Sequence, residues 1–244
     1  MCSSDLILTE GKITREFENA VAKYVGTKYA IATTSATTAL HTCFESIGVK
    51  GKKVLVSDFT FPATAHAIAL AGGIPILVDV DLDSMNVTSD IIENSISDEI
   101  TVISPVAIFG NSLENDVYKL KKNNIRIVED AATNLGTKIG NRYTGKSADL
   151  TCFSFHPRKI ITTGEGGAFF TQYDDVYNYI KLVYSQGMSE TKYLHEVLAF
   201  NYRMTNIEAA FLYAQLQDVE NILKIKYKIF KNYDKDRKST RLNS

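Results

Sequence analysis

The sequence predicts an α/β fold in three layers, with a mostly parallel central sheet covered by helices on both faces. Short, almost wholly apolar segments alternate along the chain with longer amphipathic ones. Strands separated by helices of this length form βαβ units around a parallel sheet. Strands that are apolar almost throughout are typical of a sheet buried on both faces. The 244 residues, 45% of them hydrophobic, suffice for one large domain, alone or with part of a second.

The first half of the chain contains most of the predicted strand–helix units. Residues 14–24 carry apolar side chains at helical spacing, including Phe17, Val21 and Tyr24. A strand is expected next, at 29–33, followed by a helix that ends near Ile47. The remaining segments expected up to residue 129 are strands at 54–57, 76–80, 101–106 and 125–129, and helices at 63–71, 91–96 and 117–122.

The second half of the chain has a different pattern. Two apolar strands, 150–155 and 167–171, flank a loop that contains Lys159 and several glycines. From Asp174 onward the pattern is helical. A Thr-Asn-Ile-Glu sequence at 205–208 has the spacing of a capping box, which predicts the start of a helix there.

Composition excludes several classes of protein. The formal net charge is −1, so no global charge favours nucleic acid or an anionic membrane. The longest apolar run, 63–80, is interrupted by polar and helix-breaking residues and is too broken to span a bilayer. The first residues lack the pattern of a secretory signal. Three widely spaced cysteines favour neither a disulfide framework nor a zinc site. We therefore expect a reduced, cytoplasmic protein without a metal.

The two ends of the chain do not share the domain pattern. Residues 1–7 and 237–244 are polar and patternless, and we expect them to be foreign to the domain or disordered. The lysine-rich stretch 224–238 has two interpretations, a nucleic-acid or membrane arm and a solvated helix face. Its lysines interleave with apolar residues, which favours the helix face.

One candidate site lies between the first strand and the next helix. Residues 33–38 read Thr-Thr-Ser-Ala-Thr-Thr, and small residues such as Ala36 and Thr37 at a helix start leave N–H groups free to bind a phosphate. The alternative is that these hydroxyl residues only cap the helix. The pattern by itself favours the cap.

A second candidate is Asp130, which follows the apolar strand at 125–129. In an open α/β sheet, ligands bind beyond the carboxyl ends of the strands. A carboxylate there keeps a pyridine nitrogen protonated, because opposite charge favours the charged form. It can equally cap the next segment or bind a metal, and the residue alone does not decide.

A third candidate is Lys159, in the sequence SFHPRKIITTGEGG at 154–167. A lysine held in a pocket can have a lowered pKa and attack a carbonyl carbon, and the glycines allow close approach of backbone to a ligand. The alternative is a surface lysine on a glycine turn. His156 in the same segment is expected to pack near a phosphate rather than to act as a base.

A fourth candidate is the segment 200–206, which precedes the capped helix. Asn201 and Arg203 are suited to bind anions, or alternatively to cap the helix and cover the core.

Taken together, these segments resemble a known family. SFHPRKIITTGEGG is similar to the lysine motif of the DegT/DnrJ/EryC1/StrS family of sugar aminotransferases, which use pyridoxal 5′-phosphate (PLP) and have the aspartate aminotransferase fold. FNYRMTNIEAA, DFTFPATAHAI and VEDAA are similar to three further motifs, in matching order. The resemblance covers 8–231, which would be the PLP-binding large domain with the start of a connecting helix. The resemblance also implies a smaller C-terminal domain, which we expect to be absent from this sequence.

The resemblance implies roles for individual residues. The implied cofactor contacts are Lys159, through an imine; Asp130, at the pyridine nitrogen; Phe61, on the ring face; Ala36, Thr37 and Ser154, at the phosphate; Thr133, near the ring hydroxyl; and Asn201, at the phosphate of the neighbouring subunit in a homodimer. Two positions depart from the family pattern. Thr133 replaces a Gln or His, and Ala199 stands where Gly is common.

The activity implied by the resemblance is transfer of an amino group from glutamate to a keto group of a nucleotide-linked deoxysugar, in surface polysaccharide or secondary-metabolite biosynthesis. Lys159 would move the proton between the substrate carbon and the cofactor. Family dehydratases carry His in place of the lysine, so Lys159 favours amino transfer. The alternative is a non-catalytic PLP-binding or regulatory member of the family, for which an imine-forming lysine has no use.

Overall fold

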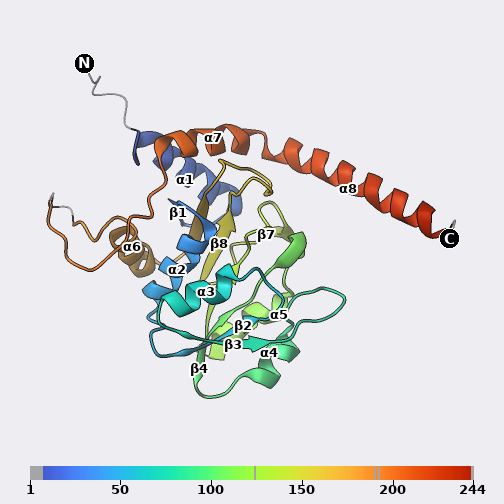
Figure 1. Ribbon diagram of the computed structural model, residues 1–244, viewed down its shortest axis with the longest axis horizontal. Helices are drawn as coiled ribbons and strands as arrows, with labels where there is room; N and C mark the ends of the chain where they lie inside the picture. Colours follow the sequence, from blue (N-terminus) through green and yellow to red (C-terminus); the bar gives the residue numbers. More distant parts are fainter. Residues whose placement is uncertain (1–7, 124, 190, 192, 243–244) are drawn as a thin grey trace.

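The central feature of the fold is a twisted, mostly parallel β-sheet (Figure 1). This computed structural model describes residues 8–123, 125–189, 191 and 193–242, and within them the sheet has seven strands in the order β1-β9-β8-β5-β4-β2-β3. β9 runs antiparallel to both its neighbours, and the other pairings are parallel. The strands are β1 (Tyr29–Thr33), β2 (Lys53–Ser57), β3 (Ile74–Val78), β4 (Ile100–Ser104), β5 (Arg126–Asp130), β8 (Leu150–Ser154) and β9 (Gly167–Thr171).

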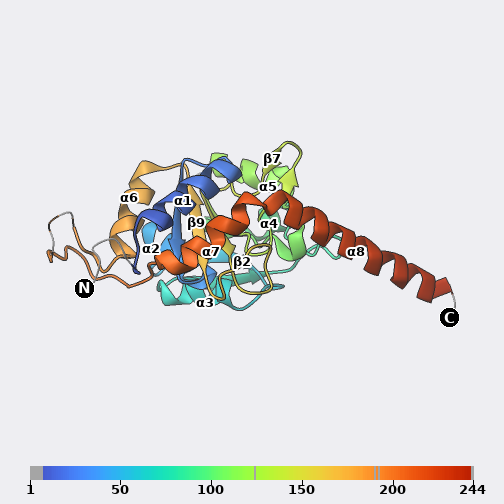
Figure 2. The same cartoon turned by 90° about the horizontal axis from the view of Figure 1, so that it is seen from above.

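Helices cover both faces of this sheet (Figures 1 and 2). One face packs against α2 (Ala36–Ser46), α3 (Ala63–Leu70) and α6 (Asp174–Val183), and the other against α1, α4, α5 and α7. The remaining bounds are α1 (Lys12–Val25), α4 (Ser89–Ser95), α5 (Asn115–Lys119), α7 (Asn206–Gln217) and α8 (Val219–Leu242), with short 3₁₀ turns at Ile108–Gly110 and Leu120–Asn123. α8 extends away from the body in both views.

Alternation along the strands explains this layering. Because successive side chains of a strand point to opposite faces, Val54 and Val56 pack beneath α2 and α3, whereas Leu55 faces α4 and α5. The same alternation places Val128 and Asp130 toward one face, and Glu129 toward the other. Apolar residues on both faces are what makes these strands apolar throughout.

The predicted three-layer α/β/α architecture is confirmed. Several bounds shift by about two residues, as at β3, which begins at Ile74 where 76 was expected. The capping box at Thr205 is present, with both of its hydrogen bonds.

Other expectations about the elements were wrong or incomplete. The helical pattern expected from Asp174 stops at Val183, and the described residues between there and α7, which begins at Asn206, form no further helix. A short hairpin, β6 (Lys138–Ile139) with β7 (Arg142–Tyr143), was not predicted, because two-residue strands carry no periodic signal. The patternless end was expected to be foreign or disordered, yet the backbone remains helical to Leu242. Residues 1–7, 243 and 244 lie outside the described part, and a foreign origin of the ends stays a prediction.

Close packing at the start of β9 determines where α2 begins. Gly167 pairs with Thr33 on one side and with Ser154 on the other. A Cβ atom at Gly167 would lie 2.3 Å from the Ala36 nitrogen, which no side chain can accommodate. Glycine therefore lets the first turn of α2 lie directly against the strand ends, where the candidate residues converge.

Candidate active site

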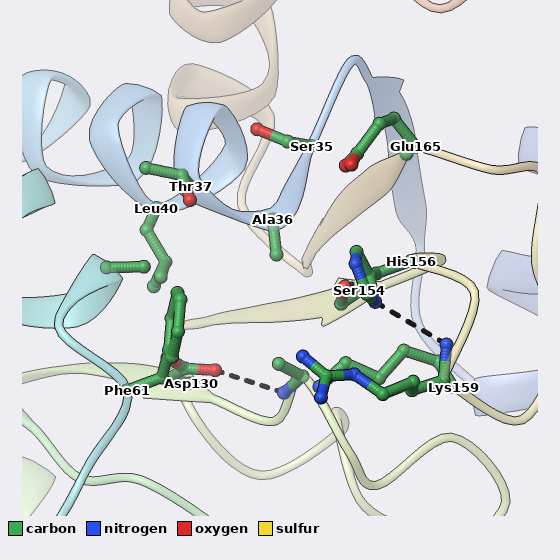
Figure 3. A pocket seen from close by; sticks show the side chains of 14 residues that line it. Ser35, Ala36, Thr37, Leu40, Phe61, Asp130, Ser154, His156, Lys159 and Glu165 are labelled. Carbon is green, nitrogen blue, oxygen red and sulfur yellow. Dashed lines mark hydrogen bonds between the residues drawn. The ribbon is translucent and has the colours of Figure 1, made fainter.

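The candidate residues converge on a cavity of about 440 Å³ at the carboxyl ends of β1, β5 and β8. In Figure 3, Phe61 and Asp130 lie on one side of this cavity, opposite Ser154, His156 and Lys159, with the start of α2 between them. The lining residues are Ser35, Ala36, Thr37, Leu40, Phe61, Ala63, Asp130, Ala132, Ser154, His156, Arg158, Lys159, Glu165 and Gly166. We call this cavity the lysine cavity.

The start of α2 lines one end of the lysine cavity. The Ser35 side chain accepts a hydrogen bond from the Thr38 N–H (3.1 Å), and the Thr38 hydroxyl accepts one from the Ser35 N–H (3.1 Å). The capping interpretation therefore holds for these two residues. The first N–H groups of a helix have no partner within it, and Ala36 and Thr37, which carry two of them, line the cavity. Ser35 and Thr38 thus cap the helix, while the neighbouring residues present free N–H groups to the cavity.

Asp130 is buried at the end of β5, where two donors hold its carboxylate. The Thr64 hydroxyl donates to Oδ2 (2.7 Å), and the Ala132 N–H donates to Oδ1 (3.0 Å). Burial raises the pKa of Asp130, while these two hydrogen bonds and the charge of Lys159 act in the opposite direction. The hydrogen bonds favour the ionised form, which is the form that can hold a proton on a facing base.

Lys159 lies in a loop that α7 and α8 hold in place. The Gln215 side chain accepts from the Thr162 N–H (3.0 Å) and donates to the Thr162 carbonyl (2.6 Å), and Lys226 Nζ donates to the Lys159 carbonyl (3.1 Å). Partial burial lowers the pKa of Lys159, and nearby Arg158 lowers it further, against the opposing effect of Asp130. A lowered pKa increases the neutral fraction of the amine, which is the nucleophilic form.

Phe61 supplies a flat apolar wall. It follows β2 and precedes α3, and 76% of its side chain is exposed. An exposed phenyl ring beside a buried carboxylate is suited to stack on a planar ring.

Metal binding and membrane insertion have no support in the described residues. Among them, no group of three or more His, Cys, Asp or Glu side chains is placed to hold a metal ion. No helix in this part of the chain is long and apolar enough to cross a lipid bilayer.

Comparison with known proteins agrees with this geometry. The model of the DegT/DnrJ/EryC1/StrS aminotransferase family matches residues 1–242. The chain belongs to this family.

Two curated members of the DegT/DnrJ/EryC1/StrS family illustrate the similarity. The GDP-perosamine synthase of Caulobacter vibrioides is 36% identical over 93% of this chain and 62% of its own length. A UDP-4-amino-4,6-dideoxy-N-acetyl-β-L-altrosamine transaminase of Campylobacter jejuni is 38% identical over 95% of this chain and 64% of its own length. The chain therefore spans less than two-thirds of the length of these relatives.

A solved structure supports the fold assignment. Streptococcus pneumoniae Spr1654 in its PLP-form superimposes with a TM-score of 0.88 at 27% identity, covering 96% of this chain and 66% of the other. The three-layer domain is thus the fold of the PLP aminotransferases.

Two residues with family-derived roles lie outside the lysine cavity. Thr133 lines a neighbouring cavity, and its hydroxyl lies 3.1 Å from the Ala107 carbonyl and 2.8 Å from Asn134 Oδ1. Asn201 is exposed, and its Oδ1 accepts from Arg203 Nε (3.3 Å). Thr205 and Glu208, not Asn201 or Arg203, cap α7. The cofactor contacts of Thr133 and Asn201 stay predictions.

The structure adds residues to the site that the sequence did not single out. Thr64 is fully buried and bonds directly to Asp130. Leu40, Ala63 and Arg158 line the cavity. Thr64 lies three residues after Phe61, so its position within the motif DFTFPATAHAI is the one signal that pointed to it. His156, expected near a phosphate, lines the cavity, and its backbone N–H donates to Ser154 Oγ (3.3 Å).

Glu129 is a buried carboxyl group on the other face of β5. It accepts hydrogen bonds from the Tyr118 hydroxyl (2.8 Å) and from Thr151 Oγ1 (3.2 Å). Burial raises the pKa of Glu129 to about 7, although these two hydrogen bonds lower it. The folded chain therefore binds this proton more tightly than the unfolded chain does.

This tighter proton binding predicts a pH-dependent stability. The contribution of Glu129 to the free energy of unfolding is fully present below its unfolded pKa of 4.5. It is lost as the pH rises through that value to the folded pKa of about 7. We expect a loss of about 3 kcal/mol in the free energy of unfolding across that window. Glu129→Gln should remove this part of the slope, as measured by urea unfolding at about pH 5 and about pH 8. Glu93→Gln, at an exposed position, serves as the control. A slope that Glu129→Gln leaves intact would contradict this assignment.

Proposed function

We propose that this protein is a PLP-dependent aminotransferase that moves an amino group from glutamate to the keto group of a nucleotide-linked deoxysugar. The observation that carries the proposal is the shared cavity. Lys159 and the buried Asp130 line it together, and the start of α2 lines it as well. A nucleophilic amine, a carboxylate and an anion site are the groups that bind a phosphorylated pyridine aldehyde.

The residues of the lysine cavity fit PLP in size and chemistry. The volume, about 440 Å³, accommodates a ring with one phosphate group. Ala36, Thr37 and Ser154 would hold the phosphate, and Phe61 would stack on the ring. Asp130, held by Thr64 and Ala132, would face the pyridine nitrogen. When bound, PLP supplies an electron sink for the carbon that loses a proton.

The protein's own residues supply attachment and proton transfer. Lys159 would hold the cofactor covalently and, once released, its neutral Nζ would take the proton from the substrate carbon and return it at the other carbon of the transfer. Partial burial of Lys159 favours that neutral form. Asp130 would keep the pyridine nitrogen protonated, because its negative charge favours the cationic ring.

The substrates follow from the relatives. One relative is a GDP-perosamine synthase and another is a UDP-amino-dideoxysugar transaminase, so we propose a nucleotide-linked keto-sugar as acceptor, in polysaccharide or secondary-metabolite biosynthesis. Glutamate, which leaves as 2-oxoglutarate, would be the donor. We do not assign nucleic acid or membrane as a partner, and a cytoplasmic location agrees with the sparse cysteines of the sequence.

A homodimer with sites at its interface is part of the same proposal. The segment 193–198 exposes Tyr193, Leu194 and Leu198, the last of them 97% exposed. Asn201, just beyond this segment, is exposed and outside the lysine cavity. Both facts suit a surface that meets a second subunit, with Asn201 reaching the phosphate of the partner's cofactor.

The alternative of a non-catalytic PLP-binding or regulatory protein is less favoured. Binding alone requires the phosphate site and the ring contacts, but not a partly buried lysine opposite a carboxylate. The relatives named above are a synthase and a transaminase of amino sugars.

The proposed function predicts a reversible reaction that can be followed from the amino-sugar side. The PLP-loaded protein, given 2-oxoglutarate and either GDP-perosamine or UDP-4-amino-4,6-dideoxy-N-acetyl-β-L-altrosamine, should form glutamate and the corresponding keto-sugar nucleotide, detected by mass spectrometry. The same amino sugar without its nucleotide is the control, and it should react poorly. Glutamate formation from simple amino acids but from neither sugar nucleotide would reject the proposed acceptor class.

A further inference from the structure

A second cavity, of about 400 Å³, adjoins the lysine cavity. Phe61, Asp130 and Lys159 line both of them. The other residues that line the second cavity are Asp58, Phe59, Thr60, Val106, Ala107, Ile108, Phe109, Ala132 and Thr133. We call it the aromatic cavity, because Phe59 and Phe109 both line it and their rings meet edge to face, with centroids 6.0 Å apart.

Phe109 occupies an unfavourable position in two respects. Its backbone is left-handed, with φ +56° and ψ +19°, which costs a residue other than glycine about 1–2 kcal/mol. Its side chain is also 70% exposed, and that of Phe59 is 44% exposed. Neither strain nor exposure of apolar rings stabilises the chain, and such combinations concentrate where a ligand binds.

Buried polar groups hold this turn in its strained form. Asn86 Oδ1 accepts from the Ile108 N–H (2.9 Å), and Thr133 Oγ1 accepts from the Gly110 N–H (3.3 Å). Asn134 Nδ2 donates to the Asn111 carbonyl (2.9 Å). Asn86 and Asn134 are 2% and 0% exposed. The turn is therefore fixed on both sides of Phe109.

We propose that Phe109, together with Phe59, contacts the C–H face of the substrate's sugar ring, and that Thr133 is a positioning residue that holds Phe109 there. This inference rests on the proposed function. The carbon that receives the amino group belongs to the sugar ring, so the ring must come to Lys159. Lys159 also lines the aromatic cavity, so a sugar ring that reaches Lys159 would lie nearer to these phenyl groups than the more distant nucleotide. Two phenyl rings offer neither a positive charge nor a hydrogen-bond donor to the carboxylates of glutamate.

Replacing Phe109 tests the contact. We expect Phe109→Ala to raise the KM for either amino-sugar nucleotide about tenfold, the usual effect of losing one aromatic contact, with kcat nearly unchanged. Formation of 2-oxoglutarate from glutamate, measured alone, should stay within about twofold. Phe109→Tyr keeps the ring and should behave like wild type. Leu82→Ala, which removes another largely exposed apolar side chain (81% exposed) outside both cavities, is the control.

Replacing Thr133 tests its positioning role. Thr133→Val preserves shape but removes the hydrogen bond to Gly110. It should raise the KM for the amino-sugar nucleotide. The double variant with Phe109→Ala should have the same KM as Phe109→Ala alone, because both substitutions remove the same contact. A Thr133→Val protein with weaker PLP binding and an unchanged sugar KM would show a cofactor contact and overturn the positioning role.

Equilibrium binding separates the sugar from the nucleotide. In calorimetry on the Lys159→Ala chain, where binding occurs without turnover, Phe109→Ala should weaken the amino-sugar nucleotide about tenfold and leave UDP or GDP unchanged. Equal weakening of the free nucleotide would place the ring against the nucleotide and overturn the inference. Unchanged binding of both the amino-sugar nucleotide and the free nucleotide would also overturn the inference. A wild-type protein that reacts with neither amino-sugar nucleotide would reject the proposed function itself, and this inference with it.

Discussion

Replacing Lys159 with alanine is expected to prevent covalent attachment of PLP and to slow amino transfer from glutamate by about 10³–10⁴-fold. Lys159 has two roles in the proposed reaction, attachment and proton transfer, and no other lysine lines the lysine cavity among the described residues. The loss should therefore appear in kcat, because proton transfer occurs only after the donor is bound. The fold should survive, since the side chain is only partly buried.

Borohydride reduction separates attachment from catalysis. The wild-type chain, incubated with PLP and reduced, should carry one phosphopyridoxyl group on Lys159 when mapped by mass spectrometry, and Lys159→Ala should carry none. Lys52→Ala is the matched control, because Lys52 is an exposed lysine outside the lysine cavity. Added methylamine should restore part of the lost rate in Lys159→Ala by replacing the missing base. Label spread over surface lysines in the wild type would contradict the assignment of Lys159.

Much of the fold was predictable because strands that are apolar throughout indicate a sheet that is buried on both faces. β1, β8 and β9 are buried on both faces, and α1 and α6, which cover opposite faces of the sheet, have amphipathic spacing. The segment 184–205 was not predictable, since it has helix-compatible residues but folds through isolated bridges such as Ser185 with Asn201. Such contacts depend on neighbours distant in the sequence, which no local pattern records.

The site was predictable to the extent that motifs mark strand ends. Asp130 could be identified because it follows an apolar strand, and Lys159 because its loop links two apolar strands. The ends of these strands meet at one edge of the sheet. The sequence did not show which polar side chains would cap a helix or hold a turn and which would line the cavity. Ser35 and Thr38 cap the helix while their neighbours line the cavity, and Thr133 bonds to the turn that contains Phe109. These choices depend on distances of a few tenths of an ångström, which composition and spacing do not encode.

Asp130→Asn is expected to slow amino transfer from glutamate about 10³-fold while PLP stays attached to Lys159. A neutral amide cannot hold a proton on the pyridine nitrogen. An ion pair at about 4 Å in a partly buried site is worth about 4 kcal/mol, which corresponds to roughly a thousandfold in rate. The borohydride label on Lys159 should therefore remain while kcat falls. A variant that loses the label as well would show that Asp130 supports the structure of the site instead of the charge of the ring.

Thr64→Val is expected to reduce the negative charge of Asp130 in part, whereas Asp130→Asn removes it completely. The Thr64 hydroxyl donates to Asp130 Oδ2 at 2.7 Å and holds the pKa of that carboxyl down against burial. Without this donor the pKa of Asp130 rises, so the ionised fraction falls first at acidic pH. Amino transfer in Thr64→Val should therefore be reduced most at low pH and recover as the pH increases, whereas the deficit of Asp130→Asn should not change with pH. Parallel pH profiles for the two variants would mean that Thr64 acts on the packing of the site and not on the charge of Asp130.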